Sequence, residues 1–387
     1  MRRTRFPGLA LVIALVAAVF ALTPLPADVG RSLGILPTPS AGSDAGVGPR
    51  AVLAQQPTAL PAPIATPEPP ATPTPVPPTP TPAPPTPTPT PWRASSYLAD
   101  RTLVTVYGRA FGVAPILGRL GSAQSFSDVA ADVGRFYDRI LALNDGKTIV
   151  PAIHLIYALA IPCEPNDDCL LYLEGTDPDI VKHYVEPAAA RGWPVILDTQ
   201  LGRSDPVTQV KRMIAKGYLN YDNVHVAIDP EFSSVPGHDT PGIPVGTVDA
   251  SEINQVQQIL DEHVRRLRLP HKKILIVHQF GDANVDDGVP YMIRNKPSLR
   301  TFENVDLVID ADGFGGPDIK VKKYNLITDP EVYPMIQWRG IKLFLPNPHE
   351  RAGHYDQPQM TIEEVFGKDE TPGGLRVKHK PNVIILA

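Results

Sequence analysis

Two carboxylates separated by one residue are the clearest chemical feature of the sequence. Asp229 and Glu231 lie in VHVAIDPEF, a run over residues 224–232 with the β-branched, apolar character of a buried strand. Successive side chains of a strand point to opposite faces, so residues two apart point the same way. Two carboxyl groups held close together repel when both are ionised, so one keeps its proton to higher pH. This spacing predicts an acid beside a base, as cleavage of a glycosidic bond requires.

The two carboxylates have distinct expected roles. We expect Glu231, with the longer side chain, to donate a proton, and Asp229 to orient it or to stabilise a charged intermediate. In the alternative interpretation, Asp229 caps the following loop and Glu231 forms a surface ion pair, which makes both residues structural. The two interpretations differ in whether the carboxylates face a common hollow.

Other polar residues stand at or near the ends of apolar runs. Carboxylates and imidazoles next to a core are costly unless they have partners, so such residues at several strand ends indicate a site. Asp198 and Asp310 are candidates for a second catalytic carboxylate or for contacts with sugar hydroxyls. We predict substrate-binding roles for Tyr107, His154, Asp198, His278, Gln279 and Asp310.

A metal-dependent hydrolase is the main rival chemistry. Oxygen and nitrogen donors for Zn, Mn or Mg are present in His154, Asp198, Asp229, Glu231, His278 and Asp310. However, the run over 103–108 has no His-x-His, and the chain has no H-E-x-x-H, no G-x-G-x-x-G after this run and no P-loop. We therefore expect neither a metal nor any other cofactor.

The scaffold that positions these residues is predicted from alternating strands and helices. Mostly apolar runs are typical of parallel strands that are buried on both faces, and parallel strands need helical crossovers. We expect a (β/α)8 TIM barrel of the α/β class, with an open doubly wound sheet as the alternative. The working face of such a barrel lies at the carboxyl ends of its strands. The predicted strands are 103–108, 148–159, 193–200, 224–232, 273–280, 305–313, 340–347 and 381–387.

The expected helices have recognisable start and stop signals. Asp205 is a candidate N-cap with Pro206 in the first turn and Gly217 at the C-terminal stop. A helix over 177–192 repeats this pattern, and its internal Pro187 is expected to kink or split it. Asp249 and Glu252 have the spacing of a capping box ahead of a longer helix.

The N-terminal part predicts export. Arg2, Arg3 and Arg5 precede an apolar run from Leu9 to Leu22, which has the form of a signal peptide cleaved near Ala27. The alternative is an uncleaved segment that anchors the protein in the membrane. Between Pro57 and Pro91, 17 of 35 residues are Pro, which is typical of an extended, disordered linker. We predict a signal peptide or anchor over 1–27, a Pro/Thr-rich linker over 28–92 and a barrel domain over 93–387, secreted or tethered at the cell surface.

The two cysteines fit an exported protein. Cys163 and Cys169 enclose a short polar loop, and in an oxidising compartment they are expected to form a local disulfide with a structural role. A metal site is a weaker interpretation, because two further ligands at a usable spacing are missing.

Charge argues against nucleic acid as a partner. The chain carries a formal net charge of −5, which is the sum of +2 on residues 1–92 and −7 on residues 93–387. Binding to phosphate groups needs a basic face, which this composition does not provide.

The strand around the carboxylate pair also resembles a known motif. YDNVHVAIDPEF is similar to the strand-four motif of family 18 chitinase-like barrels, which ends in Asp-x-Glu and an aromatic residue. Asp229, Glu231 and Phe232 match this pattern, whereas Ala227 stands where that family has another acid and Val224 or His225 replaces its glycine region. The resemblance implies a barrel glycoside hydrolase.

A broader resemblance covers most of the chain. Residues from about 98 to 387 are similar to exported bacterial barrel proteins of unassigned function, through the pieces IDPEF, VDASEIN, VHQF and IDADG. This resemblance implies the fold and no particular reaction. We expect an exported hydrolase that acts on a cell-surface glycan. The alternatives are a non-catalytic barrel that binds a glycan or peptide, and a metal-dependent hydrolase.

Overall fold

The structure describes most of the predicted barrel domain. It is a computed structural model and describes residues 92–112, 118–162, 167–238, 240–281, 292–346 and 355–387. The predicted signal peptide or anchor (1–27) and the linker up to residue 91 lie outside these ranges. No helix within the described ranges has the length and apolar character needed to cross a membrane.

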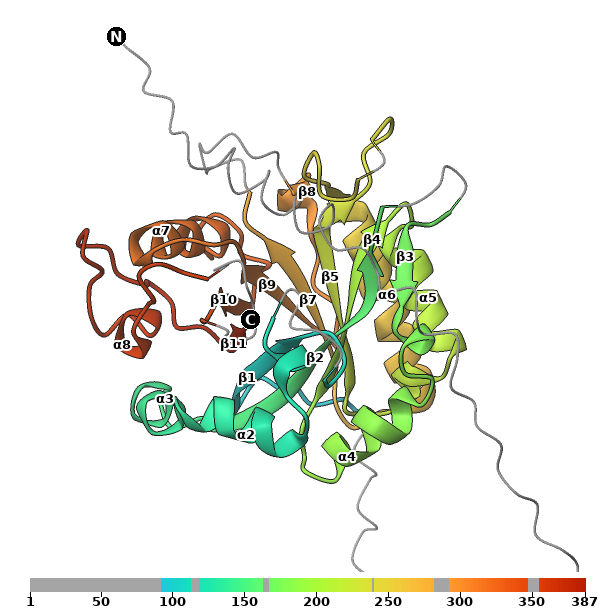
Figure 1. Cartoon of the computed structure of the whole chain (residues 1–387), viewed down its shortest axis with the longest axis horizontal. Helices are drawn as coiled ribbons and strands as arrows, with labels where there is room; N and C mark the ends of the chain where they lie inside the picture. Colours follow the sequence, from blue (N-terminus) through green and yellow to red (C-terminus); the bar gives the residue numbers. More distant parts are fainter. Residues whose placement is uncertain (1–91, 113–117, 163–166, 239, 282–291, 347–354) are drawn as a thin grey trace, which may run out of the picture. The chain divides into compact units, whose positions relative to one another are not determined.

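The strands close into a parallel barrel (Figure 1). Neighbours around the ring are parallel, and β1 pairs with both β2 and β11, which closes the sheet. The α/β barrel is thus confirmed over the open sheet, with all eight strands near their predicted positions. Around the ring they are β1 (Arg101–Gly108), β2 (Thr148–Ala160), β4 (Val195–Gly202), β5 (Val224–Ser233), β7 (Lys273–Gln279), β9 (Val305–Ala311), β10 (Trp338–Leu343) and β11 (Val383–Leu386).

Helices cover the outside of the barrel (Figure 1). Between β7 and β9, the described residues contain no α-helix but the short strand β8 (Ile293–Arg294) and the 3₁₀ turn Lys296–Ser298. The other connections contain α2 (Phe126–Gly134), α3 (Tyr137–Leu143), the π-helix Val181–Val185, α4 (Glu186–Ala189), α5 (Pro206–Ala215), α6 (Ala250–Leu267), α7 (Pro317–Ile327) and α8 (Ile362–Val365).

Short additions flank the barrel. The strand β3 (Leu170–Tyr172) extends the sheet by antiparallel pairing with β2. The strands β6 (Val248–Asp249) and β8 (Ile293–Arg294) form a separate two-stranded parallel sheet. Further 3₁₀ turns are Leu120–Ser122, Leu173–Gly175 and Tyr218–Asn220.

Local capping follows the sequence signals. Asp205 caps α5 by accepting a hydrogen bond from the Thr208 amide at 2.8 Å. Asp249 and Glu252 form the predicted capping box of α6, which fixes the start of that helix next to the barrel. The helical region before β4 changes from π-helix to α-helix at Glu186, the residue before Pro187. The predicted break at this proline is therefore a change of helix type.

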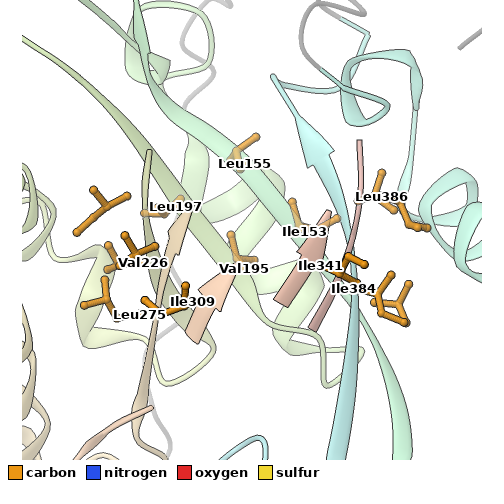
Figure 2. Close-up of a cluster of buried hydrophobic side chains, with 14 of the residues drawn as sticks. Ile153, Leu155, Val195, Leu197, Val226, Leu275, Ile309, Ile341, Ile384 and Leu386 are labelled. Carbon is orange, nitrogen blue, oxygen red and sulfur yellow. The ribbon is translucent and has the colours of Figure 1, made fainter. Parts of the chain in front are cut away.

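The alternation of each strand separates two cores. Aliphatic side chains on the outer face pack against the helices, including Ile153, Leu197, Val226 and Leu275 (Figure 2). Residues of the opposite parity fill the barrel interior with a second cluster, which includes Ile196, Ala227, Ile276, Val308 and Ile385. This alternation points the polar residues at the strand ends into the barrel.

The amino ends of the strands are closed by the segment before β1. Leu98 is fully buried there, and the Ser96 hydroxyl donates a hydrogen bond of 2.7 Å to Asp306. Trp338 donates its indole N–H to the other Asp306 oxygen at 3.1 Å. This end of the barrel is therefore held by direct polar contacts.

Candidate functional site

Polar side chains form a layer inside the barrel at the carboxyl ends of the strands. Strand pairing places Tyr107 beside His154 and His278 beside Asp310. Gln200 of β4 likewise pairs with Asp229 of β5. The sequence therefore brings residues from strands far apart in the chain into one cluster, at the end of the barrel where enzymes of this architecture bind substrate.

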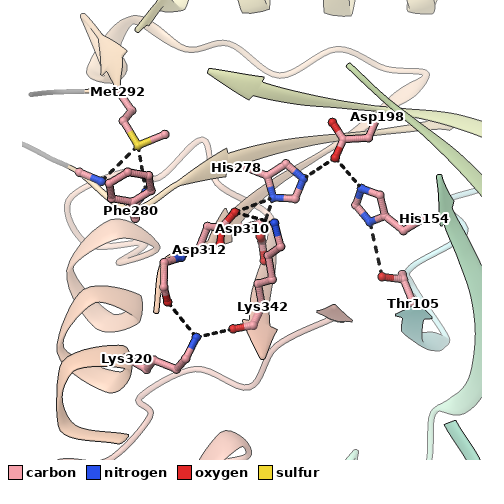
Figure 3. Close-up of polar contacts among 12 residues, drawn as sticks. Thr105, His154, Asp198, His278, Phe280, Met292, Asp310, Asp312, Lys320 and Lys342 are labelled. Atoms are coloured by element: carbon pink, nitrogen blue, oxygen red, sulfur yellow. Dashed lines mark hydrogen bonds and ion pairs between the residues drawn. The ribbon is translucent and has the colours of Figure 1, made fainter. Parts of the chain in front are cut away.

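His278 bridges two carboxylates at the centre of this layer (Figure 3). Its Nδ1 lies 2.9 Å from Asp310 Oδ2 and its Nε2 lies 3.1 Å from Asp198 Oδ2. Burial and the Lys342 charge oppose protonation, but Asp198 and Asp310 hold the pKa of His278 well above its ordinary value. His278 is therefore an imidazolium that donates from both ring nitrogens.

A second histidine extends this chain of contacts (Figure 3). His154 Nε2 lies 3.2 Å from the same Asp198 oxygen, and its Nδ1 lies 3.4 Å from the Thr105 hydroxyl. Burial lowers the pKa of His154 despite the nearby carboxylate. Burial also opposes ionisation of Asp198, but the charge of His278 and hydrogen bonds from both histidines lower the pKa of this carboxyl. Asp198 is thus ionised, with one charged and one neutral imidazole beside it.

Asp229 and Glu231 share the inward face of β5. Asp229 is 2% exposed, whereas Glu231 keeps a partly exposed side chain. Neither carboxylate forms a hydrogen bond or an ion pair within the described ranges, and Asp229 Oδ1 is buried without any such partner. Burial raises the pKa of Asp229 to about 7, with repulsion from Asp198 and Asp312 adding to the shift.

Glu231, the more exposed carboxyl of this pair, also has a raised pKa. Burial among protein atoms, followed by repulsion from Asp229 and Asp312, raises the pKa of Glu231 well above its ordinary value. Glu231 therefore carries a proton at neutral pH and still reaches solvent. An acid in this state can protonate a leaving group.

A buried ion pair completes the layer. Lys342 of β10 donates to Asp312 Oδ2 at 2.9 Å and lies 4.0 Å from the centroid of the Tyr107 ring. Asp312 lies at the end of the predicted strand 305–313, whereas the sequence analysis did not single out Lys342. The available signal was a lone lysine in the apolar run GIKLFLP, at a position whose parity points inward.

Lys320 braces the ion pair from the helical layer. Its ammonium donates to the backbone oxygens of Gly313 at 2.9 Å and Lys342 at 2.6 Å (Figure 3). It also lies 3.1 Å from a carboxylate oxygen of Asp356. These contacts tie α7 to the end of β10 and to the glycine-rich turn after Asp312.

The predicted substrate-binding residues occupy different positions. Asp198, His154, His278 and Asp310 are fully buried, so they support the site from beneath. Tyr107 is 2% exposed and stacks edge-on against both histidine rings of the layer. Gln279 has the opposite parity to His278 and donates to the Gly281 carbonyl oxygen at 2.9 Å, so it lies on the other face of β7.

The backbone beside Asp310 is shaped to admit its carboxylate. Gly340 faces the barrel interior on the neighbouring strand, and a Cβ there would lie 2.7 Å from Asp310 Oδ1. This oxygen is buried with no hydrogen-bond partner in the described part of the chain. The close approach explains why the position holds glycine.

A metal ion in the polar layer would compete with contacts that are already present. Two groups of side chains have ligand atoms close enough together, namely His154 with Asp198 and His278, and His278 with Asp310 and Asp312. Both groups include His278, whose two ring nitrogens already lie within hydrogen-bond distance of carboxylate oxygens. The Lys342 ammonium also donates a hydrogen bond to the Asp312 carboxylate. A metal would have to displace these contacts.

The predicted disulfide is not tested. Cys169 is buried with 1% exposure, next to β3. Cys163 lies outside the described residues, so the pairing of the two cysteines stays a prediction.

No protein family model, curated protein or solved structure matches the chain. The similarity of the β5 strand to the family 18 chitinase-like motif therefore gains no support from these comparisons.

Proposed function

We propose that the protein is an exported barrel hydrolase that cleaves a cell-surface or extracellular glycan by carboxylate acid/base catalysis, with Glu231 as the proton donor. The observation that carries the proposal is the placement of Asp229 and Glu231 on one inward face of β5, where burial raises both pKa values and repulsion from Asp229 adds to the shift of Glu231. A carboxyl that stays protonated at neutral pH is what protonation of a glycosidic oxygen needs.

The roles within the pair follow from exposure. Glu231 is the carboxyl that reaches solvent, so it can contact a bound substrate, whereas Asp229 lies deeper. Once Glu231 has given up its proton, the nearby negative charge of Asp229 favours taking a proton back from water. Asp229 therefore keeps Glu231 protonated between turnovers.

Aromatic side chains near the layer support a sugar substrate. Phe314 and Phe344 follow β9 and β10, are partly exposed, and have ring centroids 4.0 Å apart. Lys320 and Lys342 lie 5.1 and 5.3 Å from the Phe344 ring centroid, so this pair adjoins the charged cluster. Apolar ring faces beside a few oriented polar groups are typical of small-ligand sites.

The test measures release of reducing ends from peptidoglycan, chitin oligosaccharides and other surface glycans. Glu231→Gln removes the proton and keeps the shape, so we expect its rate to fall about 10²–10⁴-fold. Glu262→Gln on the exposed face of α6 is the matched control and should keep the wild-type rate. Equal rates for wild type and Glu231→Gln would remove the proposed roles.

The same assay separates the alternatives. Binding of a glycan without release of reducing ends would favour a non-catalytic barrel. We expect a chelator to leave the rate unchanged, because both ring nitrogens of His278 already contact carboxylate oxygens. Loss of activity on chelation, restored by a metal, would favour the metal-dependent hydrolase.

A further inference from the structure

Asp312 occupies a special position in the polar layer. It follows β9 directly, has the inward parity of Asp310 and is 6% exposed. Lys342 donates to its Oδ2 at 2.9 Å, His278 Nδ1 lies 3.5 Å from the same oxygen, and the Gly313 amide donates to Oδ1 at 2.5 Å. The carboxylate is thus held from three directions by donors on three different chain segments.

These donors fix the charge state of the group. Burial opposes ionisation, but Lys342 and His278, with the hydrogen bonds from Lys342 and Gly313, lower the pKa of Asp312. Its charge is felt at Glu231, where it adds to the repulsion that keeps that acid protonated. The mouth of the barrel therefore combines one protonated and one ionised carboxyl.

The other acids of the layer are less suited to face a substrate. Asp198 and Asp310 have no exposed surface, and each is bound to His278. Asp229 acts on Glu231, because its negative charge raises the pKa of that acid. Asp312 is the ionised acid of the layer that keeps some exposure, and the turn that follows it at Gly313 has a φ of 93°.

We propose that Asp312 is the second catalytic carboxylate, a fixed negative charge that stabilises the cation developing at the anomeric carbon. This inference rests on the proposed function. As the bond from the anomeric carbon to the glycosidic oxygen breaks, the Glu231 proton moves to the departing oxygen and Asp312 faces the positive carbon. Water then bonds to that carbon through its oxygen, and its proton returns to the Glu231 carboxylate.

The contacts of Asp312 favour electrostatic stabilisation over a covalent ester. Both of its oxygens already accept hydrogen bonds, which makes the carboxylate a weak nucleophile but a well-oriented charge. Lys342 holds this charge in place and is a positioning residue. Its role differs from that of Asp312, and this difference gives the test.

The experiment compares Asp312→Asn, the double variant Asp312→Asn/Lys342→Met, and Asp306→Asn on the glycan that wild type cleaves. Asp306 is the matched control, because it is an inward, fully buried acid on the same strand at the opposite end of the barrel. The double variant removes both charges, so it avoids leaving a buried lysine without its partner. Circular dichroism and thermal unfolding establish that each variant is folded.

We expect kcat to fall about 10²–10³-fold in both Asp312 variants with little change in KM, and Asp306→Asn to keep the wild-type kcat. If the double variant recovers wild-type kcat, Asp312 serves only to neutralise Lys342 and the inference is overturned. In that outcome, inactive Glu231→Gln would still support the proposed function. Absence of cleavage by wild type would overturn both.

Discussion

Both ends of the barrel contain buried polar groups, but the carboxylates at the two ends differ in whether their oxygens have hydrogen-bond partners. At the amino ends, Asp306 accepts hydrogen bonds from Ser96 and Trp338, and the Lys273 ammonium donates to two backbone oxygens. At the carboxyl ends, Asp229 Oδ1, Asp198 Oδ1 and Asp310 Oδ1 are buried with no hydrogen-bond partner in the parts of the chain that the structure describes. His225 Nε2 at the amino ends also lacks such a partner, but it belongs to an imidazole whose pKa burial lowers, and not to a carboxylate.

This contrast separates stability from function. Buried carboxylates with direct partners hold the fold together, whereas buried carboxylate oxygens without a partner raise the free energy of the folded state and are candidates for a functional role. The end closed by the segment before β1 is a structural plug. The opposite end contains buried charged side chains next to Glu231, which is partly exposed.

The largest expected effect concerns His278, which separates two carboxylates. His278→Ala leaves the buried Asp310 without its partner and Asp198 with His154 alone, and we expect it to lower the free energy of unfolding by about 3–5 kcal/mol in urea denaturation. His225→Ala is the control at the plug, where the imidazole accepts one hydrogen bond from the Ile274 amide. There we expect about 1–3 kcal/mol. Equal losses would break the contrast between the two ends.

Asp229 should make the protein less stable as pH rises. Its pKa is about 7 in the folded state against an ordinary value of 3.8, so between these values the folded state binds more protons than the unfolded chain. Raising the pH through this window then lowers the free energy of unfolding, by roughly 4 kcal/mol in total. Asp229→Asn, which stays neutral, should be more stable than wild type at pH 8 and nearly equal to it at pH 4. A difference that does not change with pH would contradict this account.

Asp306 should matter for stability alone. Asp306→Asn weakens the contacts with Ser96 and Trp338, and we expect it to lower the free energy of unfolding by about 1–2 kcal/mol with an unchanged catalytic rate. Urea denaturation and the reducing-end assay measure the two quantities separately. If Asp306→Asn is as stable as wild type but inactive, the amino ends of the strands contribute to activity and this account is contradicted.

The smallest effect is expected at the far end of the histidine chain. Thr105→Val keeps the shape and removes the contact with His154, whose length of 3.4 Å indicates a weak bond. We expect a loss of about 0.5–1 kcal/mol in the free energy of unfolding. A loss as large as that of His278→Ala would show that the chain acts as one unit, with no separate central bridge.

Sequence patterns predicted the barrel well because each strand carries its own signal. Alternating apolar runs and helix caps such as Asp205 and Asp249 are local, and the structure has them near the expected positions. The absence of an α-helix among the described residues between β7 and β9 could not be foreseen, because turns there depend on how the barrel closes.

The site was predictable in its members but less so in their roles. Strand parity correctly placed Asp229 and Glu231 on one face, since that depends only on spacing. The burial of Asp198 and Asp310 beneath the site and the outward position of Gln279 depend on register and on tertiary packing. Lys342 was missed because a lysine in an apolar run reveals its partner only once neighbouring strands are in place.

The central claim is that the carboxyl pair on β5 holds a proton at neutral pH. Its most direct test is titration of carboxyl ¹³C chemical shifts in wild type, with Glu231→Gln and Asp229→Asn to assign the two signals. The account predicts that Glu231 titrates well above the ordinary range of a carboxyl group and that Asp229 titrates near 7. If both signals titrate below pH 5, as exposed carboxylates do, the pair is not an acid and the proposed catalysis is wrong.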